Sequence, residues 1–326
     1  MIAVVIPCFK ATAHILQVVK GLPPWVDKIY VVDDACPVGT GKFLQQNHAD
    51  PRLSILFHTY NTGVGGATIT GYRAAMQDNC HIIVKMDSDD QMDPAYLARL
   101  IRPILAGNAD FAKGNRFFDL DALRQMPAVR RTGNLGLTLL TKVAAGYWHV
   151  SDPTNGYTAV HSAALKILSL NNLAPRYFFE SSMLIQLNIA RAVVVDIPIP
   201  ARYGTEVSSL NIKRVLLEFP VCLAKGALQR LVWRYFIHDI NAVSCLLVIG
   251  GSLCTFGLTF GIYHWILSGM AGIFSSSGTV ALATLPLIIG FQMLLQALLL
   301  DTMEKPSAPL QSWFSDESTD EELPCN

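Results

Sequence analysis

The segment whose residue types and spacing most directly indicate chemistry is Asp87-Ser88-Asp89-Asp90-Gln91, which follows an apolar, β-prone run. Side chains two residues apart at the end of an extended strand can point the same way. Asp87 and Asp89 can therefore offer hard oxygen ligands to one Mg²⁺ or Mn²⁺ ion. A nucleotide-sugar diphosphate would complete such a site, because the ion offsets the charge that builds on the leaving diphosphate. The segment predicts metal-assisted group transfer, and a solvated acidic turn is the alternative.

Alternating β-prone runs and helix-length segments fill the first 115 residues. This pattern indicates an α/β fold with a mostly parallel sheet and helices on both faces. Strands are expected at Ile2–Ile6, Lys28–Val32, Leu53–Phe57, His81–Met86 and Asp110–Lys113, and helices near Ala13, Gly41, Gly66 and Pro94. Ligands of such folds gather at the carboxyl ends of the strands. Polar or glycine-rich turns follow four of these ends, which predicts a nucleotide-binding site: Pro7, Asp33-Asp34, 61–66 and 87–91.

Together these motifs resemble those of the inverting family 2 glycosyltransferases, and among them the polyprenyl-phosphate glycosyltransferases of the dolichol-phosphate mannose synthase type. The similarity covers about residues 1–240, and the two apolar segments that follow match the membrane anchor of bacterial members. It is carried by residues 4–7 (VVIP), 31–34 (VVDD), 61–67 (NTGVGGA), 87–91 (DSDDQ), 114–116 (GNR) and 152–157 (DPTNGY). The resemblance implies a GT-A-like nucleotide-binding fold, glycosyltransferase activity and a Mg²⁺ or Mn²⁺ cofactor.

The resemblance also implies roles for individual residues. The implied donor contacts are Pro7, Phe9, Asp33, Asp34, Gly65, Gly66, Asp87 and Ser88; the implied metal ligands are Asp87, Asp89 and Gln91, with Asp89 also catalytic. Arg116 would face a phosphate, and the loop from Asp152 to Tyr157 would face the acceptor. The chain departs from the usual family pattern at Cys8-Phe9-Lys10-Ala11, at Ala35-Cys36 and at Thr158, where many members carry arginine. The acceptor side is therefore expected to differ from that of the best-known enzymes.

Two classes of acceptor remain open, and they require different catalytic groups. A polyprenyl phosphate is largely ionised at neutral pH, so it needs cations to position it, and Arg116 and Arg131, with Arg130 beside them, are the candidates. A sugar hydroxyl needs a carboxylate to take its proton, for which Asp152 or Glu180 would serve, although Glu180 can equally be a structural acid. The Gln-x-x-Arg-Trp motif of processive polysaccharide synthases is absent from the sequence, which argues against that class.

A run of 61 residues without Asp, Glu, Lys or Arg, from Ile240 to Leu300, predicts two membrane-spanning helices at about Ala242–Leu267 and Thr279–Leu300. Segment 207–239 mixes basic and apolar residues, which is typical of amphipathic helices at a membrane surface; a surface helix of the catalytic domain is the alternative. Basic residues precede the first span and none lies between the spans. This asymmetry predicts a cytoplasmic catalytic domain and cytoplasmic termini.

The predicted organisation is a catalytic domain over 1–206, surface helices over 207–239, two spans over 240–300 and an acidic, disordered tail over 301–326. The seven scattered cysteines predict neither a disulfide nor a zinc site. The expected function is inverting, metal-dependent transfer of a sugar from a UDP- or GDP-sugar to polyprenyl phosphate at the cytoplasmic face of the inner membrane. The expected partners are that donor, the lipid acceptor and the bilayer. No nucleic-acid partner is expected, and a homo-oligomer stays open. Alternatives are transfer to a hydroxyl of a lipid-linked glycan, a non-catalytic sugar-nucleotide-binding protein, and a channel or membrane adaptor.

Overall fold

The computed structural model describes residues 1–118, 128–200 and 212–314. The chain divides into two compact units, which are described separately. The first comprises residues 1–230 together with the chain from 306 onward, and the second comprises residues 231–305. The first unit carries the predicted site.

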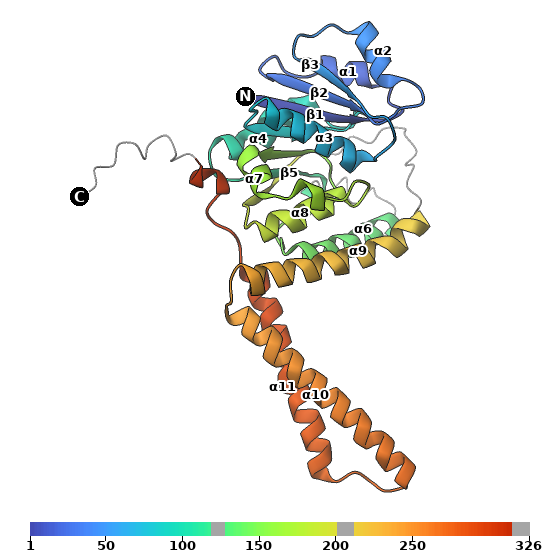
Figure 1. Ribbon diagram of the computed structural model, residues 1–326, viewed down its shortest axis with the longest axis vertical. Coiled ribbons are helices and arrows are strands. Elements are labelled where there is room, and N and C mark those ends of the chain that lie inside the picture. Colours follow the sequence, from blue (N-terminus) through green and yellow to red (C-terminus); the bar gives the residue numbers. More distant parts are fainter. Residues whose placement is uncertain (119–127, 201–211, 315–326) are drawn as a thin grey trace, which may run out of the picture. The chain divides into compact units, whose positions relative to one another are not determined.

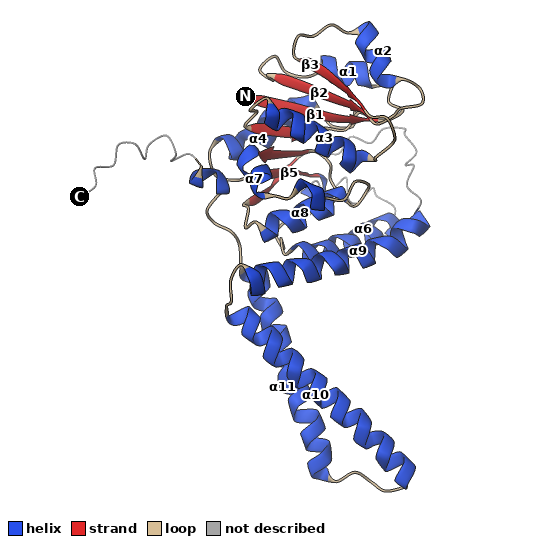
Figure 2. Cartoon of the chain, viewed as in Figure 1, coloured by secondary structure: helices blue, strands red, loops and turns tan. Residues whose placement is uncertain are grey.

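A seven-stranded sheet in the order β3-β2-β1-β4-β6-β5-β7 forms the centre of the first unit (Figures 1 and 2). Its strands are β1 (Ile2–Cys8), β2 (Lys28–Asp33), β3 (Leu53–Phe57), β4 (Ile82–Lys85), β5 (Phe111–Asn115), β6 (Thr158–His161) and β7 (Val194–Pro198). Strands β3, β2, β1 and β4 are parallel neighbours, β6 runs antiparallel to both β4 and β5, and β5 pairs with β7 in parallel. The prediction of a mostly parallel α/β sheet is confirmed.

Helices cover both faces of this sheet. They are α1 (Ile15–Lys20), α2 (Thr40–Asn47), α3 (Val64–Gln77), α4 (Leu97–Leu105), α6 (Ala128–Ala145), α7 (Ser162–Ile167) and α8 (Phe179–Ile189). Alternate residues of β1 enter different cores, since Val5 packs with α3, α7 and α8 while Val4 and Ile6 pack with α1, α2 and α4. A strand buried on both faces reads as a continuous apolar run, which explains why β1 was recognisable in the sequence.

The long helix α9 (Ile212–Val232) lies beside α6 in Figure 1 and is joined to it by Arg230. Arg230 is 2% exposed, and its Nε and Nη2 donate to the carbonyls of Ala144 (2.9 Å) and Val143 (3.2 Å) at the end of α6. A cation at a helix C-terminus satisfies carbonyls that lack helical partners. Segment 207–239 was expected to lie at a membrane surface, and the burial of Arg230 against α6 corrects that expectation for this residue.

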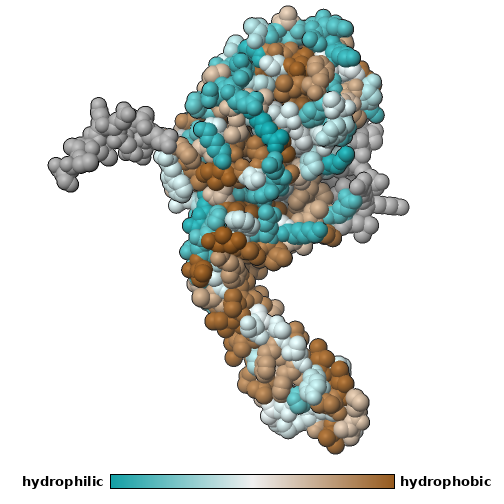
Figure 3. All heavy atoms as spheres, in the orientation of Figure 1, coloured by the Kyte–Doolittle hydropathy of each residue, from teal (hydrophilic) through white to brown (hydrophobic). Residues whose placement is uncertain are grey.

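The second unit is a helical hairpin of α10 (Ala242–Ala271) and α11 (Ser277–Met303), preceded by a π-helical turn at Trp233–Ile237. Both hairpin helices are long and apolar enough to cross a membrane, and Figure 3 shows hydrophobic residues covering much of their surface. The two helices pack closely where Gly250 meets Gly290. Glycine at both positions allows this approach, because a Cβ at either one would crowd the backbone of the opposite helix. Their bounds extend the two predicted spans by a few residues.

The base of the hairpin holds its own buried polar cluster. The Tyr235 hydroxyl donates to Asp301 (2.6 Å) and approaches Glu304 (3.0 Å), which also pairs with Arg234 at 3.1 Å. Arg234 is 2% exposed, so it too serves a protein contact and does not lie on an open basic face.

The chain after α11 departs from the expected disordered tail. A short 3₁₀ helix at Leu310–Trp313 belongs to the first unit, where Leu310 is 1% exposed within the hydrophobic core. Gln311 donates its side chain to the carbonyls of Ile104 and Ala109 and its backbone N–H to Asp110. One apolar side chain and one amide therefore anchor this segment, while the acidic residues from 315 onward lie outside the described residues.

Candidate active site

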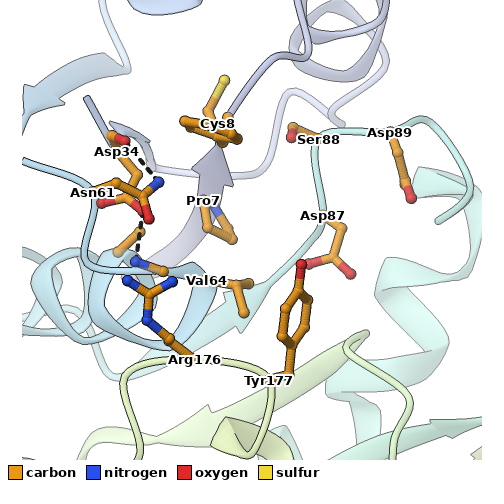
Figure 4. A pocket seen from close by; sticks show the side chains of 13 residues that line it. Pro7, Cys8, Asp34, Asn61, Val64, Asp87, Ser88, Asp89, Arg176 and Tyr177 are labelled. Carbon is orange, nitrogen blue, oxygen red and sulfur yellow. Dashed lines mark hydrogen bonds between the residues drawn. The ribbon is translucent and has the colours of Figure 1, made fainter. Parts of the chain in front are cut away.

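A cavity of about 500 Å³ opens at the carboxyl ends of β1, β2 and β4 (Figure 4). It brings together residues from five separate segments of the chain. Those predicted from sequence to contact the donor or metal are Pro7, Phe9, Asp34, Asp87, Ser88 and Asp89. The other predicted residues whose side chains are described, among them Asp33, Gln91, Arg116 and Asp152, do not line this cavity.

The two adjacent acids after β2 have separate surroundings. Asp33 is buried, and its carboxylate accepts the backbone N–H of Cys36 (2.7 Å) and of Gly41 (2.6 Å) at the start of α2. A Cβ at Gly41 would lie 2.7 Å from Asp33 Oδ2, so glycine allows the helix to approach the acid this closely. Asp33 therefore anchors α2 and does not line the cavity, whereas its neighbour Asp34 does.

Asp34 holds the glycine-rich turn in place at the cavity wall. Its carboxylate accepts the backbone N–H groups of Thr62 (2.8 Å) and Gly63 (2.7 Å) and contacts His58 Nδ1 at 2.8 Å. Burial opposes ionisation of this acid, but the hydrogen bonds from Thr62, His58 and Gly63 prevail and hold the pKa of Asp34 below its usual value. The acid stays ionised and fixes the turn that precedes α3.

Asp87 and Asp89 both line the cavity, as the strand-end spacing predicts. The side chain of Asp87 is one-third exposed. Asp89 accepts the backbone N–H of Gln91 at 3.1 Å, and the left-handed backbone of Asp90 (φ 61°) makes the turn between Asp89 and Gln91. Within the ranges that the structure describes, no group of three His, Cys, Asp or Glu side chains could hold a metal ion. Two carboxylates suit Mg²⁺ or Mn²⁺ when substrate phosphates and water complete the shell, so the residues fit such an ion only together with a diphosphate.

A buried lysine, Lys85, ties Asp87 to helix α8. Its side chain is 1% exposed, and Nζ lies 2.7 Å from Asp87 Oδ1 and 3.2 Å from Glu180 Oε1. Burial disfavours the ammonium, but the two carboxylates outweigh it and raise the pKa of Lys85 above its usual value. Glu180, one of the two acids considered as a base, is therefore engaged in an ion pair.

Asp152, the other acid considered as a base, is fully buried and paired with Arg116. Arg116 Nε donates to Oδ2 at 2.7 Å and Nη2 to Oδ1 at 3.1 Å, so the guanidinium grips both carboxylate oxygens. Burial alone would raise the pKa of Asp152, but Arg116 and the nearby Lys113 lower it overall. An acid with a lowered pKa is a weak base.

Lys113, on β5, is a second buried lysine. Its ammonium donates to the carbonyl of Asn155 at 2.6 Å, which fixes the loop that carries Asp152. Burial lowers the pKa of Lys113 to about 8, against the opposing effect of Asp152 and Asp196. Thr158 on β6 is the register partner of both Lys85 and Lys113, so a small neutral side chain fits a position where a third cation would be repelled.

The glycine-rich turn makes room for another loop of the protein. A Cβ at Gly63, whose φ is +91°, would lie 2.7 Å from the carbonyl of Pro175 and 2.8 Å from Arg176 Cγ. A Cβ at Gly65 would collide with the carbonyl of Ala174, and one at Gly66 with the side chain of Thr62. Gly63 and Gly65 therefore let loop 174–178 lie directly on the turn. Gly65 and Gly66 were predicted as donor contacts, but neither lines the cavity.

Several site residues escaped the sequence reasoning. Arg176 and Tyr177 reach the cavity from the loop before α8, and Tyr177 points toward Asp87 in Figure 4. Nothing in their spacing signals this, because the loop arrives from over eighty residues beyond the aspartates. Lys85 did leave a signal, since it is a lone charge closing the apolar strand Ile82–Lys85. Arg130 and Arg131 lie in α6, and their side chains are outside the described part of the structure.

Comparison with known proteins adds independent information. The profile of the family described as "Glycosyl transferase family 2" matches residues 3–168. The chain is 31% identical over 235 residues to UDP-N-acetylglucosamine--dolichyl-phosphate N-acetylglucosaminyltransferase of Methanococcus voltae, covering 68% of this chain and 93% of that protein. It is 29% identical over 173 residues to undecaprenyl-phosphate mannosyltransferase of Micrococcus luteus, covering 52% and 70%.

A likeness of fold comes from solved structures. Glucosyl-3-phosphoglycerate synthase from Mycobacterium tuberculosis, in complex with Mn²⁺, UDP and glucosyl-3-phosphoglycerate, superposes with a TM-score of 0.52. Its sequence is 20% identical, and the match covers 74% of this chain and 81% of that one. Mannosyl-3-phosphoglycerate synthase from Rubrobacter xylanophilus gives a TM-score of 0.54 at 15% identity, covering 74% and 77%.

Proposed function

Because the chain belongs to glycosyl transferase family 2 and is a glycosyltransferase, we propose that it transfers a sugar from a nucleotide diphosphate sugar to a polyprenyl phosphate at a membrane surface. Two relatives named for dolichyl-phosphate and undecaprenyl-phosphate acceptors support the lipid phosphate. The donor is a UDP- or GDP-sugar, and a structural neighbour holding UDP and Mn²⁺ supports the nucleotide and the divalent ion.

The observation that carries this proposal is the state of the two acids that could serve as a base. Asp152 is fully buried in a two-point pair with Arg116, and Glu180 is paired with Lys85. A sugar hydroxyl would require one of them to accept a proton, and a carboxylate held by a cation does so poorly. A phosphate monoester is already largely ionised at neutral pH and requires no base. The pairing therefore favours a phosphate acceptor.

The side chains around the cavity suggest how transfer would proceed. A bound Mg²⁺ or Mn²⁺ would be held by Asp87 and Asp89 and would supply charge neutralisation for the departing nucleoside diphosphate. Lys85 keeps the Asp87 carboxylate oriented, and Asp34 holds the turn before α3 at the wall of the cavity that would take the donor. Asp152 holds Arg116, whose side chain is 38% exposed and whose guanidinium would position the acceptor phosphate for direct, inverting attack on the sugar.

The hairpin is proposed to anchor the enzyme in the membrane, with both of its ends on one side. Leu310 belongs to the core of the first unit, and only six residues separate it from the end of α11. An extended chain of that length covers about 20–24 Å, less than the roughly 30 Å of a hydrocarbon core. The chain thus returns to the side it left. The uncharged loop at 272–276 and the basic residues before α10 support a cytoplasmic location for that side.

Incubation of the detergent-purified protein with UDP- and GDP-sugars, undecaprenyl phosphate and Mg²⁺ or Mn²⁺ tests the proposal. A glycolipid should form with at least one donor, and EDTA should abolish it. Full turnover in EDTA would contradict the role of Asp87 and Asp89, and release of free sugar without glycolipid would contradict the lipid acceptor.

A further inference from the structure

Arg176 stands out among the cavity residues because its guanidinium holds no other part of the described structure in place. It is the sole basic residue among those that line the cavity in the described part of the chain, opposite Asp34, Asp87 and Asp89. Its guanidinium makes no hydrogen bond or ion pair with any residue that the structure describes, whereas Arg116 is paired with Asp152. In Figure 4 its side chain rises from the loop before α8 toward Asn61 and Asp34.

The loop that carries Arg176 is fixed independently of that side chain. The carbonyl of Pro175 accepts the backbone N–H of Gly66 at 2.8 Å, and the N–H of Ala174 donates to Ser182 Oγ at 3.0 Å. Gly63 provides the space into which Arg176 Cγ fits, since a Cβ there would come within 2.8 Å of that atom. The glycine-rich turn and the loop thus hold an arginine over the cavity.

The charge of the cavity indicates what this arginine would bind. A divalent ion on Asp87 and Asp89 would offset those two acids, and the ionised Asp34 is satisfied by backbone N–H groups and His58. A nucleoside diphosphate brings further negative charge that these groups do not match. A guanidinium suits phosphate because its planar fork donates two parallel hydrogen bonds.

We propose that Arg176 binds the diphosphate of the nucleotide donor, and that the turn at Gly63 positions the Arg176 side chain for this contact. The inference rests on the proposed function for the donor class alone and is independent of the acceptor. The glycine-rich turn then has a positioning role, because its glycines leave space for loop 174–178, which carries Arg176.

Calorimetric titration of the full-length protein in Mg²⁺ with UDP, UMP and uridine, and with the guanosine series, tests this. Arg176→Gln should weaken UDP or GDP binding by about tenfold to a hundredfold while nucleoside binding stays unchanged. Arg176→Lys should fall between, because it keeps the charge and loses the fork. Gly63→Ala should also weaken diphosphate binding although Arg176 is retained.

Arg73→Gln is the matched control, since Arg73 is exposed, lies outside the cavity and donates to Asn171. Arg73→Gln should leave diphosphate binding unchanged. If it weakened diphosphate binding as much as Arg176→Gln does, the effect would come from the net charge of the protein, and the proposal would be overturned. Equal losses for diphosphate and nucleoside in Arg176→Gln, or none for either, would also overturn it. If the unaltered protein bound neither UDP nor GDP, the donor assignment and this inference would both fail; intact binding without sugar transfer would count against the lipid acceptor only.

Discussion

At the residue scale, the carboxylates around the site differ in their partners, and those partners decide what each can do. Asp34 is held by backbone N–H groups, Asp87 by Lys85 and Asp152 by Arg116. Only Asp87 of these three reaches solvent appreciably. Removal of a partner should therefore have different effects on stability and on rate.

Substitution at the Arg116–Asp152 pair separates a base from an orienting acid. Asp152→Asn should slow transfer to polyprenyl phosphate by no more than about tenfold, whereas loss of a true base costs about a hundredfold or more. Arg116→Gln should slow transfer more. It should also lower the free energy of unfolding by roughly 1–3 kcal/mol, because it leaves Asp152 buried and unpaired beside a partly exposed site. Steady-state rates and chemical denaturation check this, and a larger rate loss in Asp152→Asn than in Arg116→Gln would contradict it.

The lowered pKa of Lys113 predicts the direction in which the free energy of unfolding changes with pH. Its pKa of about 8 lies below the usual 10.5, so between these values the unfolded chain binds a proton that the folded chain has released. The free energy of unfolding should therefore rise with pH across this interval, by up to about 3 kcal/mol, relative to Lys113→Met. Asp152, Asp196, Glu180 and Arg116 are the charges that act on it, and none is altered in this variant. Denaturation curves at pH 7 to 10.5 that run parallel for the two proteins would argue against this assignment.

At the element scale, the periodicity and composition of the sequence predicted most of the strands and both hairpin helices. Strands β1 to β5 and the two hairpin helices were anticipated to within a few residues, because continuous apolar runs and charge-free lengths are local signals. Strands β6 and β7 were not assigned. Arg176 was also missed, because its place depends on a loop from a distant segment lying on Gly63. Asp33 and Asp34 look identical in sequence and differ only in which N–H groups surround them.

The segment after α11 is the clearest difference between composition and structure. Residues 301–326 were expected to form an acidic, disordered tail, but Leu310 enters the core, and most of the acidic residues follow from 315 onward. Leu310→Ala should lower the free energy of unfolding of the first unit by about 2–5 kcal/mol. Trp313→Ala, at a 65% exposed position of the same 3₁₀ helix, should change it little. Equal and small effects of both substitutions would mean that the segment is not docked in solution.

At the scale of the whole molecule, the hairpin and the catalytic unit are expected to be separable in function. Replacing residues 231–305 by a short flexible linker keeps Leu310 attached, whereas simple truncation after Arg230 removes it from the core. The linker variant should bind nucleotide normally yet act poorly on acceptor in vesicles, because the bilayer concentrates and orients the lipid. The truncated chain should be less stable as well. Equal rates of the linker variant and the full chain on vesicle-embedded acceptor would exclude an anchoring role.

The central claim is that the acceptor is a phosphate that needs no base, and a matched pair of lipids tests it most directly. Glycolipid formation should be measured with undecaprenyl phosphate and with undecaprenol, which has the same chain and a hydroxyl in place of the phosphate, at saturating donor and Mg²⁺. The account predicts rapid transfer to the phosphate and none detectable to the alcohol, with the phosphate reaction surviving in Glu180→Gln. Transfer to the alcohol at a comparable rate, abolished by Glu180→Gln or Asp152→Asn, would contradict the account and establish a hydroxyl acceptor with a catalytic base.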